Sequence, residues 1–126
     1  GIGLLQEDPG NNAHVARIVA FRIADGKLAT VAEFNKDYFA KDASKLMTID
    51  EESSGIIDAT AMVAKPGDTK KYFYFNAQVH TTGAYTARPD LTTKSPSGIL
   101  KFNQKTLEGG AYYSLTITDW KTVFGS

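Results

Sequence analysis

The sequence contains no cysteine, which excludes disulfides, thiolate metal ligands and cysteine nucleophiles together. It also has no excess of charge of either sign, because 14 basic residues balance 14 acidic ones. This balance gives no indication of nucleic acid or an anionic membrane surface as a partner. No apolar run approaches the roughly 20 residues that cross a bilayer, so we expect no membrane span. Phosphate-binding loops, zinc-binding His-Glu-x-x-His motifs and dinucleotide fingerprints are missing as well.

The pattern of short apolar and alternating stretches, separated by turn residues, predicts an all-β fold with antiparallel sheets. At 126 residues the chain has the length of one domain with a real core. Asp25-Gly26 is a typical hairpin turn between two strands, 15–23 and 28–34. We expect one short helical connection within 35–45 and a long polar connection over 81–97. Further strands are expected at 2–5, 46–49, 55–64, 72–80, 98–103 and 111–120.

An internal repeat refines this fold prediction. An apolar strand with acidic residues beside it is followed by two longer strands, first within 4–34 and again within 51–102. A repeat of roughly 45 residues is typical of propeller blades. We therefore expect residues 1–126 to form a single all-β domain, or a fragment of a larger β-propeller, with two to three propeller-type blades or an incomplete propeller or sandwich.

The densest set of candidate ligands is the stretch 50–58, DEESSGIID, in which three consecutive carboxylates precede an apolar run. Carboxylate oxygen is the ligand that calcium and magnesium prefer. The spacing is not that of an EF-hand, so the ligands of any cation would converge from separate loops. Strand alternation separates Glu51 from Glu52, and we prefer Glu52 as the inward ligand. The candidate metal ligands are Glu7, Asp8, Glu51, Glu52 and Asp58.

Simpler interpretations of the same residues stay open. Glu7 and Asp8 can be solvated loop charges, and Ser53 and Ser54 cap and turn residues rather than nucleophiles. Asp58, expected inside an apolar strand, needs a metal or a hydrogen bond to backbone or hydroxyl groups to offset its burial.

A candidate pocket is indicated by three further polar residues. Gln78 and His80 share one face at the end of a predicted strand and could line a common pocket, although polarity at a sheet edge explains them as well. His14 precedes the predicted hairpin and is either a structural residue or a ligand.

Three segments carry a resemblance to a known family: LLQEDPGNNAHVARI at 4–18, DEESSGIID at 50–58 and NAQVH at 76–80. In this order, over about residues 3–82, they resemble bacterial secreted proteins related to PhoX-type alkaline phosphatases. The resemblance implies a β-propeller whose axial channel holds calcium, and in the enzymes iron as well, for phosphoester hydrolysis. It also implies that Glu7 and the pair Glu51 and Glu52 lie on inner strands near the channel. The iron-ligating cysteine of the enzymes is missing, so the resemblance does not carry their catalysis over to this chain.

Two functional hypotheses follow. The first is a segment of an exported, calcium-dependent, phosphatase-like β-propeller, secreted or periplasmic, whose acidic loops contribute metal ligands to a phosphoric ester hydrolase. The second is a non-enzymatic secreted β-domain that assembles with itself or binds partner proteins through strand edges. In both, we expect open sheet edges to be covered by copies of the chain or by the remainder of a longer one.

Overall fold

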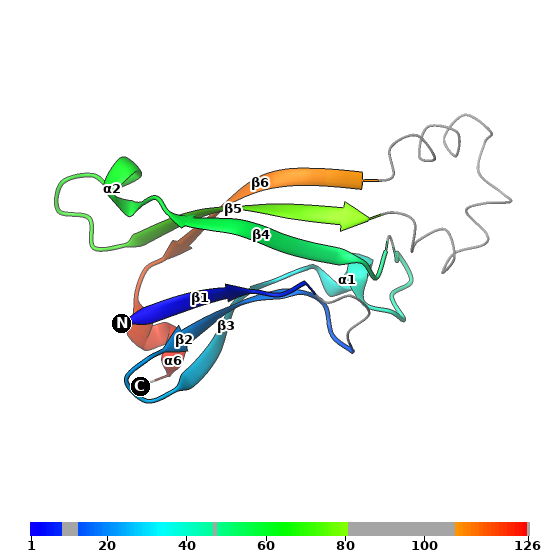
Figure 1. Ribbon diagram of the computed structural model, residues 1–126, viewed down its shortest axis with the longest axis horizontal. Helices are drawn as coiled ribbons and strands as arrows, with labels where there is room; N and C mark the ends of the chain where they lie inside the picture. Colours follow the sequence, from blue (N-terminus) through cyan, green and yellow to red (C-terminus); the bar gives the residue numbers. More distant parts are fainter. Residues whose placement is uncertain (9–12, 47, 81–107, 126) are drawn as a thin grey trace, which may run out of the picture.

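The computed structural model describes residues 1–8, 13–46, 48–80 and 108–125. This part of the chain forms two three-stranded antiparallel sheets with three short helices, which confirms the predicted all-β class (Figure 1). The described helices are all too short to span a membrane.

The first sheet contains the predicted hairpin. Its strands pair in chain order, as β1 (Ile2–Gln6), β2 (Arg17–Arg22) and β3 (Lys27–Glu33). In the turn between β2 and β3, Gly26 has a φ of 71°, which glycine adopts without strain.

A short helix follows the first sheet, where one helical connection was predicted. It is α1 (Lys36–Phe39), and the side chain of Asn35 caps it by accepting a hydrogen bond of 2.9 Å from the backbone N–H of Asp37. Strand β3 ends at Glu33, two residues before this cap.

The second sheet also pairs in chain order, as β4 (Glu51–Asp58), β5 (Lys71–His80) and β6 (Glu108–Ile117). The prediction of a strand over 55–64 is wrong at both ends. Pairing with β5 begins already at the acidic residues, and after β4 the chain turns into a short helix, α2 (Thr60–Val63). The described residues of the predicted strand 46–49 are not in a strand.

The reason for this error lies in the middle of β4. Gly55 has a φ of 63°, and the register with β5 shifts between Ser54 and Ile57. The apolar run that suggested a strand start is therefore the second half of a bulged strand, whose first half is polar in sequence but partly buried.

The end of the chain differs from the prediction in a similar way. The expected strand 111–120 ends at Ile117, and Trp120 belongs to α6 (Trp120–Phe124). Asp119 caps this helix by accepting a hydrogen bond of 3.0 Å from the backbone N–H of Lys121. Helix α6 packs against β3 of the first sheet. The predicted strand 98–103 and connection 81–97 lie outside the described residues.

The two sheets form two layers, with β1 and β4 side by side (Figure 1). The amide side chain of Gln6 joins them, because its Oε1 accepts a hydrogen bond of 2.9 Å from the backbone N–H of Ile56. The first copy of the predicted repeat, within 4–34, corresponds to the first sheet. The second copy differs from the prediction, because the third strand of the second sheet is β6, which lies beyond residue 102, and the predicted strand 98–103 is outside the described residues. The buried apolar residues, mostly small, are Val15, Ala16, Ile18, Ala20, Leu46, Ala59, Ala77, Ile117 and Phe124.

Candidate functional site between the two sheets

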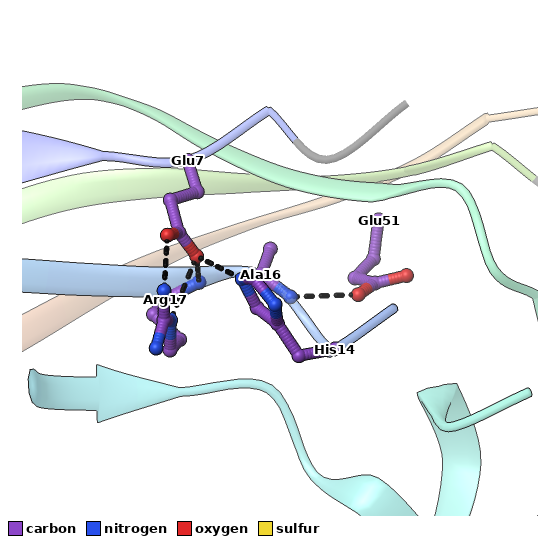
Figure 2. A network of polar contacts seen from close by, with 5 residues as sticks. All are labelled: Glu7, His14, Ala16, Arg17 and Glu51. Atoms are coloured by element: carbon purple, nitrogen blue, oxygen red, sulfur yellow. Dashed lines mark hydrogen bonds and ion pairs between the residues drawn. The ribbon is translucent and has the colours of Figure 1, made fainter. Parts of the chain in front are cut away.

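Two of the predicted carboxylates meet the same short segment. Glu7 follows β1, Glu51 begins β4, and their side chains contact consecutive residues, Arg17 and Ala16, where β2 starts (Figure 2). Two separate regions of the sequence are thereby brought to one end of the interface between the sheets.

The Glu7 carboxylate is fully engaged by cationic and backbone donors. Its Oε1 accepts a hydrogen bond of 2.7 Å from Arg17 Nη2, and its Oε2 accepts bonds of 3.0 Å from both Arg17 Nε and the Arg17 backbone N–H. His14 Nε2 lies 3.3 Å from the same Oε2 (Figure 2). The hydrogen bond from Arg17 is the main cause that lowers the pKa of Glu7. A metal ion would have to displace Arg17 to reach this carboxylate.

The Glu51 carboxylate, in contrast, is buried and has a single hydrogen-bond donor among the described residues. The residue is 1% exposed, and its Oε1 accepts a hydrogen bond of 2.8 Å from the backbone N–H of Ala16. Its Oε2 is buried and has no hydrogen-bond partner among the residues that the structure describes. Desolvation by this burial raises the pKa of Glu51, against the lowering effect of the bond from Ala16.

The register of β4 explains why Glu51 is inside. Glu51 lies opposite Val79, and Ser53 lies opposite Ala77. These residues share the face of the second sheet that is directed toward the first, because alternate residues of a strand point to the same side. Ser53 is accordingly buried as well.

The prediction that the Glu52 side chain points inward is wrong. Glu52 lies opposite Gln78, on the other face of the second sheet. In a regular strand Glu52 would share a face with the apolar Ile56, because alternate residues point to the same side. The bulge at Gly55 interrupts this alternation, so the relation does not hold here. Glu51 and Glu52 do point to opposite faces of the sheet, as expected. However, Glu51 takes the inner face and Glu52 the outer one.

The remaining predicted ligands do not join Glu51. Asp8 is exposed just beyond β1. Asp58 lies at the far end of β4, roughly 23 Å along the strand from Glu51 at about 3.3 Å per residue. It is exposed, and its Oδ1 accepts a hydrogen bond of 2.8 Å from the backbone N–H of Thr60. The expectation of a buried Asp58 is therefore wrong, and the alternative of a hydrogen bond to backbone is confirmed.

Of the three residues of the predicted pocket, Gln78 and His80 both belong to the end of β5, two positions apart as predicted, whereas His14 lies in the segment before β2. His14 lies against Glu7, and Gln78 lies opposite Glu52 on the second sheet. The backbone of His80 pairs with Glu108 at the end of β5.

The described residues do not fit a calcium site. Within this part of the chain, no group of three or more His, Asp or Glu side chains is arranged so that it could hold a metal ion. Glu7 is already neutralised by Arg17, and Glu51 offers one free oxygen. The sequence also contains no cysteine, the iron ligand that the resemblance to PhoX-type enzymes would require. We therefore derive no catalytic step that passes through a metal.

Two important residues were not singled out by the sequence. Arg17 was regarded only as part of a strand, and Ser53 as a cap or turn residue. The register of β1 with β2 carries the missing signal for Arg17, because Gln6 lies opposite Ile18. The next residue, Glu7, therefore lies opposite Arg17, and its backbone N–H donates a hydrogen bond of 3.0 Å to the Arg17 carbonyl. No comparable local signal exists for Ser53, whose burial depends on the other sheet.

Comparisons with protein-family models, curated proteins and solved structures found no match to this chain. The resemblance to PhoX-type proteins stays a prediction, and the function has to be argued from the geometry.

Proposed function

We propose that this chain is a non-enzymatic, exported β-domain that assembles by adding a strand to the free edge of β6. The strand comes from a second copy of the chain, or from a further part of a longer one. The observation that carries the proposal is the composition and exposure of this edge strand.

After its first residue, Glu108, strand β6 lacks the residue types that usually protect an edge strand. From Gly109 to Thr118 the sequence contains no charged residue and no proline. Tyr112 is 89% exposed, and its neighbours Ala111 and Tyr113 are exposed too. Natural proteins usually guard a long edge with lysine, proline or a bulge, since unpaired N–H and C=O groups bind other strands. The register of β6 with β5 runs from end to end without a bulge.

The other sheet edges each contact another described element. Strands β1 and β4 lie against each other, and the backbone N–H of Ser53 is 3.5 Å from the carbonyl oxygen of Glu7. Helix α6 packs against β3, and the Lys27 ammonium donates a hydrogen bond to the carbonyl of Phe124. No described element packs to a similar extent against the outer side of β6.

The strand count supports the same proposal. Each described sheet has three strands, whereas a propeller blade typically has four. A strand added along β6 would complete the second sheet to this number by backbone hydrogen bonds, as in other cases of strand addition.

The test is the oligomeric state of the 126-residue chain by sedimentation equilibrium over a range of concentrations. We expect reversible self-association, together with concentration-dependent protection of the β6 amides from hydrogen exchange. Tyr112→Lys places a charge on the exposed edge strand and should weaken the association about tenfold or more. The matched control is Tyr74→Lys, which changes a half-exposed tyrosine of the central strand β5.

A chain that stays monomeric at all concentrations, with fast exchange throughout β6, would contradict the proposal. Equal effects of Tyr112→Lys and Tyr74→Lys would contradict it too, because they would show that the association depends on the sheet face rather than on the edge.

A calcium-dependent, phosphatase-like activity is the second candidate. It is supported by the resemblance and by one feature of the site, the buried and unpartnered Oε2 of Glu51. Since the described residues supply no complete set of ligands, the others would come from residues 9–12, 47 or 81–107, or from a partner chain.

Calorimetry distinguishes this candidate from the first. If Glu51 is a ligand, calcium raises the melting temperature relative to EDTA, and Glu51→Gln abolishes this difference. Glu52→Gln is the control, since Glu52 lies on the other face of the sheet. Equal melting temperatures with calcium and EDTA, and no release of phosphate from a simple phosphomonoester, would exclude the calcium-dependent activity. The assembly function would then be the remaining candidate.

A further inference from the structure

A cleft of about 510 Å³ lies between the inner faces of the two sheets. One side is formed by residues of β2, β3 and α1, and the other by residues of β4, β5 and β6. This volume is within the range of about 300–1,000 Å³ that is common for small-molecule sites.

Aromatic pairs stand on both sides of the cleft. On the side of the first sheet, the rings of Phe34 and Phe39 meet edge to face with centroids 5.1 Å apart. On the side of the second sheet, the rings of Phe75 and Tyr113 are stacked with centroids 5.6 Å apart. Such rings offer flat apolar surfaces to a ligand that enters between them.

Small residues keep the space between these aromatic pairs open. Ala32 of the first sheet and Ala77 and Ala111 of the second line the same cleft. A larger side chain at any of the three positions would extend into the volume that the alanines leave free.

The cleft also contains a buried hydroxyl in need of a partner. Ser53 lines it and is 6% exposed, and its Oγ has no hydrogen-bond partner within the described ranges. A buried polar group without a partner is costly. Because the Oγ is itself buried, a donor or acceptor of a ligand reaches it only after the side chains that cover it shift, and the new hydrogen bond then relieves this cost.

Charge at the cleft does not favour an ion. Arg17 is bonded to Glu7, and Glu33 lies 3.0 Å from the ammonium of Lys36. Both charged residues that line the cleft are thus already paired with a charge of opposite sign.

We propose that this cleft binds an uncharged, largely apolar small molecule that contains a flat ring and a single hydrogen-bonding group directed at Ser53. The ring lies between the two aromatic pairs. This site is independent of the edge of β6, because it is formed by the inner faces of the sheets.

The probe for the test is N-phenyl-1-naphthylamine, an uncharged molecule with two aromatic groups and one N–H. We expect a saturable, blue-shifted fluorescence increase with one probe bound per chain. Ala111→Phe fills the cleft and should weaken binding about tenfold or more. Ser114→Phe is the matched control, since it adds the same side chain to the opposite face of the same strand and should leave binding unchanged.

The role of the hydroxyl is tested separately. Ser53→Ala should weaken binding about 2–10-fold, the range expected for one hydrogen bond, whereas Ser54→Ala on the other face should have no effect. If Ala111→Phe does not fold, as judged by circular dichroism, Ala32→Leu fills the cleft from the first sheet instead.

Probe binding that does not saturate, or that is the same in the cleft-filling variants and in Ser114→Phe, would overturn the proposal. A decrease in probe binding when the protein self-associates would also overturn the proposal, because it would show that a second copy of the chain fills the cleft. The two proposals fail separately, because a monomeric chain can still bind the probe and an associating chain can fail to bind it.

Discussion

Glu7 and Glu51 contact two consecutive residues, Arg17 and Ala16, at the start of β2, but their surroundings shift the pKa values of the two carboxyls in opposite directions. The Glu7 side chain is 25% exposed and shares both of its oxygens with Arg17 or His14. Glu51 is almost fully buried and has one backbone donor and one oxygen without a described partner. The hydrogen bonds lower the pKa of the first carboxyl, and burial raises the pKa of the second. Two glutamates that look alike in the sequence thus differ in which protonation state the fold favours.

The largest effect is expected from removal of the buried carboxyl. Glu51→Ala leaves the backbone N–H of Ala16 without its acceptor and creates a cavity, so the free energy of unfolding should fall by about 3 kcal/mol. Glu51→Gln retains an acceptor oxygen and removes the buried charge, and it should stay within about 1 kcal/mol of the wild type at pH 7. Urea denaturation measures both. If Glu52→Ala, on the opposite face, lowered the free energy of unfolding as much as Glu51→Ala, burial would not explain the difference between the two carboxylates.

A smaller loss is expected at the exposed carboxylate. Glu7→Gln removes the charge that holds Arg17 and should cost about 1 kcal/mol, because the pair is partly exposed to solvent. Glu33→Gln, which changes a more exposed pair with Lys36, is the control and should cost about half as much or less. A loss at Glu7 as large as that of Glu51→Ala would show that the two sites do not differ as their burial suggests.

The pH dependence of stability should have opposite signs at the two sites. The lowered pKa of Glu7 means that its contribution to stability is fully present above the ordinary pKa of 4.5 and is lost as the pH falls through the folded-state pKa. The raised pKa of Glu51 means that its contribution is present below 4.5 and is lost as the pH rises through the folded-state pKa. Denaturation of wild type, Glu7→Gln and Glu51→Gln between pH 3 and 8 tests this. Relative to wild type, Glu51→Gln should gain stability as the pH rises, and Glu7→Gln should gain it as the pH falls.

The smallest effect is expected from salt. Screening weakens the partly exposed contacts of Glu7 with Arg17 and His14, so 0.5 M NaCl should lower the stability of the wild type by a few tenths of a kcal/mol. Glu7→Gln should lose most of this dependence, and Glu51→Gln should keep it. Equal salt dependence in the two variants would mean that other surface pairs, such as Arg22 with Asp25, dominate the response.

Parts of the fold could be predicted well because their signals are local. Asp25-Gly26 defines a hairpin by its own backbone preferences, and Asn35 caps α1 through a side chain two residues from its donor. The strand β5 was predicted to within one residue, because its run of aromatic and β-branched residues favours no other element.

Other parts were mistaken because polarity is not a reliable measure of burial in a strand. Glu51 and Ser53 look like loop residues, yet pairing with β5 and the presence of the first sheet bury both. Asp58 looks like a buried charge in an apolar run, yet the strand ends there and the carboxylate is exposed. In each case the neighbours that decide the environment are distant in the sequence.

The sequence by itself determined the class of the fold and the hairpin of the first sheet, since backbone preference and alternation act over a few residues. It also identified residues 50–58, in which three consecutive carboxylates precede an apolar run, as the densest set of candidate ligands. Only the tertiary structure decided which carboxylate of that segment is buried, because the bulge at Gly55 changes the alternation and the first sheet supplies the covering layer. The pairing of Glu7 with Arg17 follows from the register within the first sheet. The edge of β6, which pairs with no second strand among the described residues, and the cleft beside Ser53 follow from the arrangement of the strands and sheets.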